Sequence, residues 1–275
     1  MEKLIKFVLR VYLNSVNYLF PKLGGKHAFM VFCHPFAVTL KKHQARFLET
    51  AEHFSVPFEA KTIAGYKWGN GSKKVLCVHG WASHSYRWKK FAQELSKLNY
   101  TVYAIDAPAH GNSDGTLFNV PMYARLIDLL IAEYHFDMIV AHSLGAFSTL
   151  ALLYEKPETK MNKLVAMGMP GEASDFIDLF MAELNLKPYV ATNFINYFKG
   201  YAKKEPSYYS ALKFAKSLNV NGLIIHDTDD RESDYDYAFK VHQVWKDSQF
   251  MQTKGLGHKL KHISVVERVI KFLEE

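Results

Sequence analysis

The chain has 275 residues, of which 49% are hydrophobic, 15% aromatic and 22% charged. This composition excludes a disordered protein, a collagen-like fibre and a small disulfide-built scaffold. The formal net charge is +7, but the 34 basic residues are spread along the chain without a cluster. We therefore expect no nucleic-acid partner.

Residues 1–20 are predicted to form an amphipathic helix. Its apolar face carries residues at helical spacing: Leu4, Val8, Val11, Ser15 and Leu19. Polar residues interrupt the segment often enough to exclude a signal peptide or a membrane span. Two placements stay open: a helix docked on its own domain, or an interfacial helix resting on an anionic membrane. We expect residues 1–60 as a whole to be an N-terminal helical segment packed on or next to the core.

Cys33 and Cys77 are the only cysteines. Cys77 lies in the apolar run 75–78, where a buried free thiol is expected. A single available bridge in a chain of this length argues against a disulfide-built exported protein. We therefore predict a reducing, cytoplasmic compartment. Peripheral contact with a membrane through residues 1–20 stays open.

From residue 62 onward, short apolar runs alternate with longer segments of helical spacing. Strands are predicted at 74–78, 100–105, 138–141, 164–167, 223–225 and 249–252, and helices at 86–98 and 120–134. This alternation indicates an α/β fold with a mostly parallel central sheet and helices on both faces. The functional residues of such sheets gather at the carboxyl ends of the strands.

Residues 171–218 form a stretch that is too long for an ordinary connection between two strands. The stretch is rich in Phe and Tyr. We interpret it as a short helical cap insertion over the functional edge of the sheet. An ordinary long crossover with its own small core is the alternative.

The strongest chemical signal is the segment 141–146, AHSLGA, between a predicted strand and a predicted helix. A nucleophilic serine at a sharp strand-to-helix turn needs small residues two positions before and after it, because larger side chains would clash with the packed strand and helix. Ala141 and Gly145 meet this need around Ser143. The turn also directs the N-terminus of the helix at negative charge that develops during a reaction.

Together with two further motifs, this segment resembles the α/β-hydrolase superfamily. The HGW sequence at 79–81 is similar to that family's His-Gly-x oxyanion segment, and DAPAHGNSDG at 106–115 is similar to its Asp-x-Pro-x-x-Gly-x-Ser loop. The resemblance covers roughly residues 60 to 275. It implies the α/β-hydrolase fold for a domain at 61–275, with Ser143 as the nucleophile and a triad in the order Ser, acid, His.

The resemblance narrows the base and the acid of the triad to the C-terminal third of the chain. His258 ends a GLGH sequence that is similar to the family's Gly-x-Gly-His context. The acid is expected at Asp230, in the loop after a predicted strand. Asp227 stands where family members commonly carry glycine. A one-residue shift in this acidic loop therefore leaves Asp229 and Asp234 as alternatives.

The backbone N–H groups of Trp81 and Leu144 are expected to form the oxyanion hole. The side chains of Trp81, His84 and His142 are candidates for the substrate pocket. The acidic loop lacks the Asp-x-Asp-x-Asp-Gly spacing of a calcium site. We therefore expect neither a metal nor a cofactor.

The leading functional hypothesis is a serine hydrolase that cleaves a carboxylic ester, a thioester or an amide through an acyl-enzyme intermediate. Ser143 would attack, His258 would carry the proton and Asp230 would orient the histidine. The expected substrate is a small molecule with an apolar or aromatic acyl group. Two alternatives stay open: a membrane-surface lysophospholipase-like or lipase-like hydrolase docked through residues 1–20, and a non-catalytic ligand-binding protein on the same fold.

Overall fold

The computed structural model describes residues 2–35 and 39–275 of the chain. They divide into two compact units. The sheet unit comprises Pro35–Gly171 and Ala211–Glu275, and the helical unit comprises Met1–His34 and Glu172–Ser210. This division differs from the expected one, in which the boundaries lay at residue 60 and at about 171–218.

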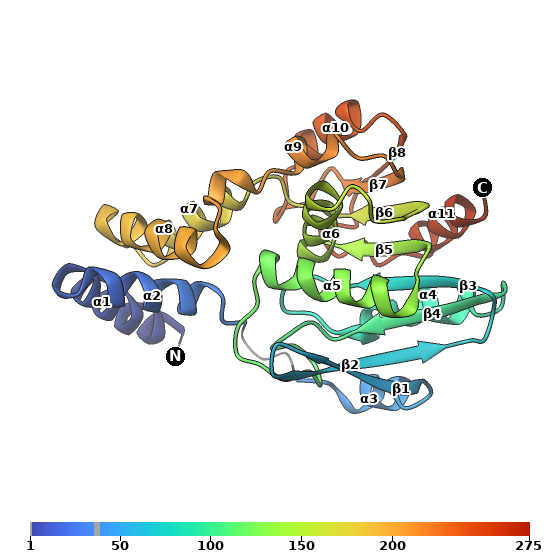
Figure 1. Cartoon of the computed structure of the whole chain (residues 1–275), viewed down its shortest axis with the longest axis horizontal. Coiled ribbons are helices and arrows are strands. Elements are labelled where there is room, and N and C mark those ends of the chain that lie inside the picture. Colours follow the sequence, from blue (N-terminus) through green and yellow to red (C-terminus); the bar gives the residue numbers. More distant parts are fainter. Residues whose placement is uncertain (1, 36–38) are drawn as a thin grey trace. The chain divides into compact units, whose positions relative to one another are not determined.

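The sheet unit is built on an 8-stranded sheet with the order β1-β2-β4-β3-β5-β6-β7-β8 (Figure 1). Along this order, each pair of neighbours in the stretch β4-β3-β5-β6-β7-β8 is parallel. Strand β2 pairs antiparallel with both β1 and β4. The strands are β1 (Glu52–Phe58), β2 (Lys61–Trp68), β3 (Lys73–Val78), β4 (Tyr100–Ile105), β5 (Met138–His142), β6 (Lys163–Met167), β7 (Asn221–Asp227) and β8 (Ser248–Thr253).

Helices cover both faces of this sheet (Figure 1). Helices α5 (Val120–Tyr134) and α6 (Leu144–Glu155) lie on one face, and α4 (Lys89–Leu95) and α11 (Ile263–Glu274) lie on the other. The other helical elements of this unit are α3 (Lys42–Leu48), η1 (Ser85–Trp88), α9 (Ala211–Ala215) and α10 (Tyr235–Val244). The predicted fold class is therefore confirmed.

The central strands explain why the sequence predicts this sheet well. Every residue of β4 is buried, as are the last four residues of β3. A strand covered by helices on both faces must be apolar on both sides, so it reads as a continuous apolar run. The six predicted strands correspond to β3 to β8.

Strands β1 and β2 lie where the sequence predicted no strand, and β1 falls inside residues 1–60, which were expected to be helical. Strand β1 is at the edge of the sheet and buries only Val56 and Phe58. Pro57 lies between these two residues, a placement that edge strands tolerate because one side of their backbone has no partner. The exposed half of β1 therefore gave no apolar run to detect.

The helical unit combines two segments that are far apart in the sequence. It contains α1 (Glu2–Leu19), α2 (Pro21–Phe32), α7 (Ala173–Glu183), α8 (Pro188–Ala202) and η2 (Pro206–Tyr208). Its aromatic core centres on Phe29 of α2, whose ring lies 5.0–6.1 Å from four rings of α8: Phe194, Tyr197, Phe198 and Tyr201. Gly25 allows the two helices to approach, because a Cβ there would lie 2.3 Å from the carbonyl oxygen of Asn193.

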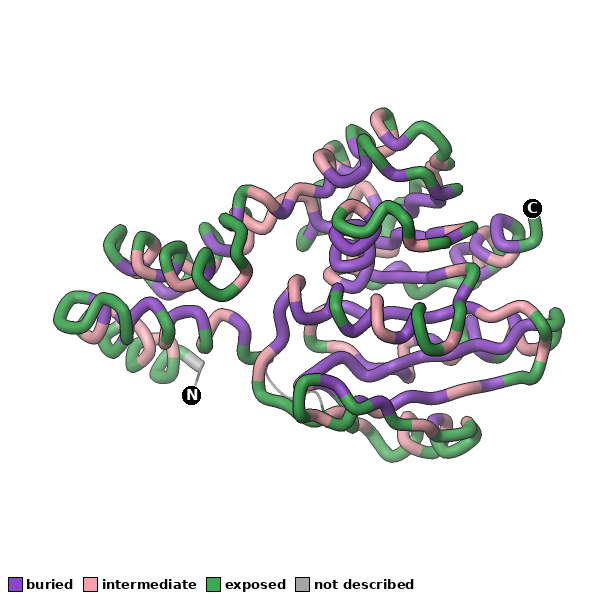
Figure 2. Tube along the Cα trace, viewed as in Figure 1, coloured by how far each residue is buried: buried purple, intermediate pink, exposed green. Residues whose placement is uncertain are grey.

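Helix α1 packs on this unit, but through the side opposite the face expected to dock. Leu13 and Asn17 are buried. The predicted apolar face is exposed, as the mainly green trace of α1 shows (Figure 2): Leu4, Val8, Val11, Ser15 and Leu19.

Candidate active site

Ser143 occupies a sharp turn between β5 and α6. Its φ of 53° and ψ of −128° lie in a region that residues other than glycine rarely adopt. A Cβ added to Gly145 would lie 2.6 Å from the carbonyl oxygens of both Val78 and His79. Glycine at this position therefore allows α6 to begin directly against the end of β3. Ala141, the other small residue of the motif, is fully buried.

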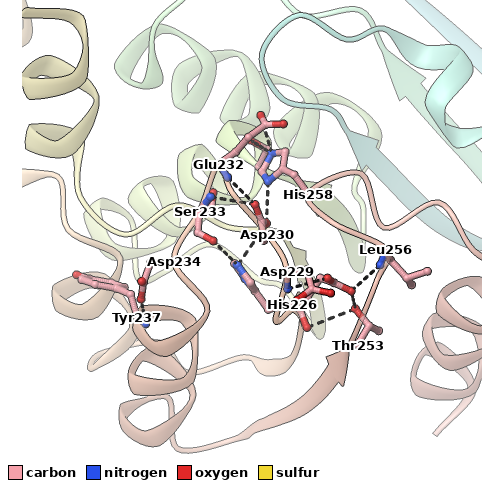
Figure 3. Close-up of polar contacts among 12 residues, drawn as sticks. His226, Asp229, Asp230, Glu232, Ser233, Asp234, Tyr237, Thr253, Leu256 and His258 are labelled. Carbon is pink, nitrogen blue, oxygen red and sulfur yellow. Dashed lines mark hydrogen bonds and ion pairs between the residues drawn. The ribbon is translucent and has the colours of Figure 1, made fainter. Parts of the chain in front are cut away.

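His258 lies between Ser143 and a buried carboxylate. Its Nε2 is 3.0 Å from Ser143 Oγ. Its Nδ1 is 2.9 Å from Asp230 Oδ2 (Figure 3). An ionised carboxylate only accepts hydrogen bonds, so Nδ1 carries the proton and Nε2 accepts the serine hydroxyl. Ser143 is partly exposed, whereas the side chain of Asp230 is buried. The three side chains thus form one hydrogen-bonded chain whose hydroxyl end is open to solvent.

The loops that carry these residues follow three strands of the parallel part of the sheet. Ser143 follows β5, Asp230 follows β7 and His258 follows β8. Because these strands are parallel, their carboxyl ends lie at the same edge of the sheet. The site therefore lies where functional residues of such sheets gather.

The two alternative carboxylates have other partners. Asp229 Oδ2 accepts a hydrogen bond from the backbone N–H of Gly255 at 3.1 Å. Asp234 caps the N-terminus of α10, where its Oδ1 accepts from the backbone N–H of Tyr237 at 2.6 Å. Among the three candidates, the carboxylate within hydrogen-bond distance of the His258 ring is that of Asp230.

The orientation of Asp230 is fixed by its own loop. Its Oδ1 accepts hydrogen bonds from the backbone N–H groups of Glu232 at 2.8 Å and Ser233 at 3.0 Å (Figure 3). One carboxylate oxygen is therefore used by the turn, and the other is directed at His258. Sequence alone does not reveal this turn, which is why Asp229 and Asp234 stayed open.

The family model for the alpha/beta hydrolase fold matches residues 73–204. A serine hydrolase-like protein of Danio rerio is 29% identical over 127 residues, which are 43% of this chain and 36% of that protein. A 2-hydroxy-6-oxononadienedioate/2-hydroxy-6-oxononatrienedioate hydrolase of Escherichia coli (strain K12) is 29% identical over 111 residues, which are 36% of this chain and 37% of that protein. The chain thus matches little more than a third of the length of these curated relatives.

Solved structures share the fold over most of the chain. A putative lipase from Acinetobacter baumannii AYE has a TM-score of 0.65 at 16% identity, covering 86% of this chain and 96% of the lipase. A thioesterase domain from the curacin biosynthetic pathway has a TM-score of 0.61 at 19% identity, covering 82% of this chain and 99% of that domain. The chain therefore has the α/β-hydrolase fold, and its residues 73–204 match that family's model. At these identities, the likeness to the solved structures concerns the fold alone.

The environment of Asp230 favours the ionised carboxylate. Burial alone would raise the pKa of Asp230, but hydrogen bonds from His258 and from the backbone of Glu232 outweigh burial and hold it below its ordinary value. Asp230 therefore stays charged near neutral pH. A charged Asp230 beside Nδ1 would stabilise a protonated His258 ring.

Asp227, at the position where family members commonly carry glycine, ties the two loops of the site together. Its Oδ2 accepts hydrogen bonds from Thr253 Oγ1 at 2.7 Å and from the backbone N–H of Leu256 at 2.9 Å. Burial acts to raise the pKa of Asp227, yet these hydrogen bonds lower it overall. Leu256 lies two residues before His258, so this buried carboxylate helps to position the base.

His142 contacts the base from the other side. Its Nε2 donates a hydrogen bond to the backbone carbonyl of His258 at 2.8 Å, and the two ring centroids are 4.8 Å apart. Burial, followed by repulsion from Arg87 and His258, lowers the pKa of His142 well below its ordinary value. A neutral His142 therefore holds the His258 backbone without adding charge beside the ring. The place of His142 in a substrate pocket stays a prediction.

The segment 79–82 passes directly beside the serine. A Cβ on Gly80 would lie 2.6 Å from Ser143 Cβ and 3.1 Å from Ser143 Oγ. His79 donates through Nδ1 to the Gly80 carbonyl at 2.7 Å, and His110 Nε2 accepts from the backbone N–H of Ala82 at 3.1 Å. The loop predicted to supply the Trp81 oxyanion donor is thus held close to Ser143 by two histidines.

The other predicted pocket residues are placed as follows. The ring of Trp81 packs edge-on against His110 at 6.0 Å and against Phe118 at 5.7 Å. His84 is 6% exposed, and its ring lies 6.2 Å from that of Tyr86. Burial lowers the pKa of His84. Contacts with a substrate stay predictions for both residues.

Several further observations concern metals, thiols and membranes. Within residues 2–35 and 39–275, no three His, Cys, Asp or Glu side chains are grouped so that they could hold a metal ion. Cys33 and Cys77 are free and buried, and burial raises the pKa of each thiol. In the same described ranges, every helix is too short or too polar to cross a bilayer.

Proposed function

We propose that the protein is a serine hydrolase that cleaves a carboxylic ester or a related acyl bond. The observation that carries this proposal is the hydrogen-bonded chain from Ser143 through His258 to Asp230. A serine hydroxyl is a weak nucleophile until a base accepts its proton, and a base acts well when a third group holds its ring. All three groups lie at one edge of the sheet in the required order.

In the first step, Ser143 Oγ attacks the carbonyl carbon of the substrate while its proton moves to His258 Nε2. The Oγ–carbon bond forms, and the carbonyl electron pair moves to oxygen. Asp230 keeps Nδ1 protonated and stabilises the charged ring. The tetrahedral intermediate collapses when His258 returns the proton to the leaving oxygen, sulfur or nitrogen. The product of this step is an acyl-serine.

In the second step, water replaces the leaving group. His258 accepts a proton from the water as its oxygen attacks the acyl carbon, and a second tetrahedral intermediate forms. This intermediate collapses when the bond from the acyl carbon to Oγ breaks and His258 returns the proton to Ser143 Oγ, which releases the acid. Both tetrahedral intermediates carry an oxyanion, and we assign its stabilisation to the backbone N–H groups of Leu144 and Trp81. Leu144 is the first residue of α6, where N–H groups point out of the helix. Each such donor contributes about 3–4 kcal/mol to the stability of the transition state.

A panel of chromogenic acyl substrates tests the proposal. We expect p-nitrophenyl esters to be hydrolysed with an initial burst approaching one p-nitrophenol per chain, because the acyl-enzyme accumulates when deacylation is slow. Thioesters and anilides with the same acyl groups are included, and their hydrolysis rates show which leaving group the protein prefers. A 2-hydroxy-6-oxo dienoic acid is also included, since the Escherichia coli relative is a hydrolase of compounds of this kind.

Ser143→Ala is the matched variant for this panel. It should lose the burst and reduce turnover to the background of the buffer. Turnover by Ser143→Ala at the wild-type rate would contradict the proposed nucleophile. Tight binding of the panel without turnover by the wild-type protein would instead favour a non-catalytic ligand-binding protein.

A further inference from the structure

Helix α1 presents an apolar face that its own unit leaves uncovered. Residues that follow one another at helical spacing are all well exposed: Leu4 at 66%, Val8 at 55%, Val11 at 48% and Leu19 at 64%. Large apolar side chains at such exposure are not unusual one by one, but a continuous helical face of them indicates an interaction site.

The contacts on the opposite side of α1 keep this face outward. Asn17 is buried, and both its backbone carbonyl and its Oδ1 accept hydrogen bonds from Asn193 Nδ2 of α8 at 3.1 Å. Asn14 Oδ1 accepts from the backbone N–H of Lys187 at 2.9 Å. A rotation of α1 that buried the apolar face would break these bonds and expose Leu13. The exposed face is therefore a fixed feature of the unit.

The apolar surface continues into the turn between α1 and α2. Tyr18 is 74% exposed, Phe20 60% and Leu23 46%. Tyr and Phe side chains suit the boundary between lipid headgroups and acyl chains, since they combine a large apolar area with few rotatable bonds. The site thus combines aliphatic residues along the helix with aromatic residues at its end.

Basic residues are interspersed with these apolar residues in the sequence, and the Nζ of one of them, Lys6, lies 3.6 Å from Glu183 Oε2. Within residues 2–26 the sequence carries five cations and a single acid, Glu2. The cations are Lys3, Lys6, Arg10, Lys22 and Lys26. Lys3, Lys22 and Lys26 are exposed. An apolar face bordered by cations matches the anionic headgroup region of a phospholipid bilayer.

We propose that α1 and the first turn of α2 dock on the surface of an anionic phospholipid bilayer, with the apolar face of α1 against the acyl-chain boundary. The charges favour this occupant over a second copy of the chain, because two copies joined through α1 would bring like charges together. The proposal does not depend on the catalytic assignment, since vesicle binding and ester turnover are measured separately.

Vesicle co-sedimentation of the full chain tests the proposal. We expect at least tenfold tighter binding to vesicles of phosphatidylcholine with phosphatidylglycerol than to vesicles of phosphatidylcholine alone. Binding should weaken when NaCl is raised from roughly 0.05 M to roughly 0.5 M, because salt screens exposed charges. Equal binding to both kinds of vesicle, or no binding to either, would overturn the proposal.

Two pairs of variants localise the surface. Val8→Asp/Leu19→Asp should weaken binding to anionic vesicles at least tenfold, whereas Leu98→Asp/Ile263→Asp, which alters exposed apolar residues of the sheet unit, should not. Lys22→Gln/Lys26→Gln should weaken it about fivefold per charge, with Lys240→Gln/Lys246→Gln as the matched control. Equal losses in variants and controls would contradict the assigned surface.

Light scattering and turnover complete the experiment. The wild-type chain should be monomeric without vesicles, and every variant should hydrolyse a water-soluble ester at the wild-type rate. A dimer that dissociates in Val8→Asp/Leu19→Asp would assign the face to a second copy and overturn the proposal. If the wild-type chain binds anionic vesicles but does not hydrolyse esters, the result contradicts the proposed function and leaves the proposed docking surface standing.

Discussion

His258 is held at three points, which is the main residue-scale feature of the site. Asp230 binds its ring, His142 binds its backbone carbonyl, and Asp227 binds the loop that precedes it through Leu256. Asp227 and His142 have no part in the proton transfer, so we describe them as positioning residues. Their effect is to leave Nε2 directed at Ser143.

Replacing the acid tests this arrangement. Asp230→Asn should lower kcat for a soluble ester by about 10³–10⁴-fold, because the amide no longer fixes the tautomer of His258. Asp229→Asn, whose carboxylate binds the Gly255 backbone, should change kcat by less than about tenfold. Steady-state kinetics of the two variants measure the difference. A larger loss in Asp229→Asn would show that the acid has been assigned to the wrong residue.

The sequence predicted Ser143, His258 and Asp230 as the three members of the hydrogen-bonded chain, with Asp229 and Asp234 open as alternatives to Asp230. The predicted glycine-flanked loop does carry His258 at 3.0 Å from Ser143 Oγ. The choice of Asp230 depends on backbone hydrogen bonds of Glu232 and Ser233 that direct one oxygen to the ring. Such bonds depend on the loop conformation and have no counterpart in residue spacing.

At the scale of elements, the site depends on how closely α6 and the segment 79–82 approach the serine. Gly145 places the start of α6 against β3, and Gly80 places the backbone before Trp81 against Ser143. Neither position has room for a Cβ. The two glycines therefore determine the distance between the proposed oxyanion donors and the nucleophile.

Gly145→Ala should destabilise the protein by about 1–3 kcal/mol, because its Cβ would overlap two carbonyl oxygens and force α6 to shift. Gly200→Ala in α8 is the matched control, since its Cβ would meet no atom within 4 Å. The control should be neutral or more stable by up to about 1 kcal/mol. Urea unfolding measures both, and equal stability of the two variants would contradict the packing argument.

Elements differ in how well the sequence predicts them. Helix α5 was predicted with its bounds, Val120–Tyr134, because its apolar residues recur at helical spacing. Strand β1 was missed because it is mostly exposed at the edge of the sheet, and β2 was missed because polar residues interrupt its buried ones, so neither has an apolar run. The aromatic stretch at 171–218 was detected, but its partner was not, because the pairing of α8 with α2 joins segments far apart in the chain.

At the scale of the whole molecule, buried neutral histidines couple stability to pH. Burial, with repulsion from neighbouring cationic groups, lowers the pKa of His79 and His142 well below the ordinary value. The unfolded chain binds protons at these positions as the pH falls below about 6.5, whereas the folded protein does not. Above that pH both states are neutral at these positions, so the two histidines do not change the free energy of unfolding; below it, protonation of the unfolded chain lowers this free energy progressively.

Urea unfolding at two pH values measures this coupling. Between pH 7.5 and pH 5.5 we expect each of the two histidines to lower the free energy of unfolding by about 1 kcal/mol. His142→Gln should reduce the pH dependence by about the same amount. An unchanged free energy of unfolding across this range would contradict the assignment of neutral buried histidines.

Active-site labelling tests the central claim, that Ser143 is a nucleophile activated by His258. A fluorophosphonate probe should label the wild-type protein at one site, and mass spectrometry should find the adduct on the peptide that contains Ser143. Ser143→Ala should not be labelled, and His258→Ala should be labelled at least 100-fold more slowly because the base is gone. Labelling of Ser143→Ala at the wild-type rate would contradict the account.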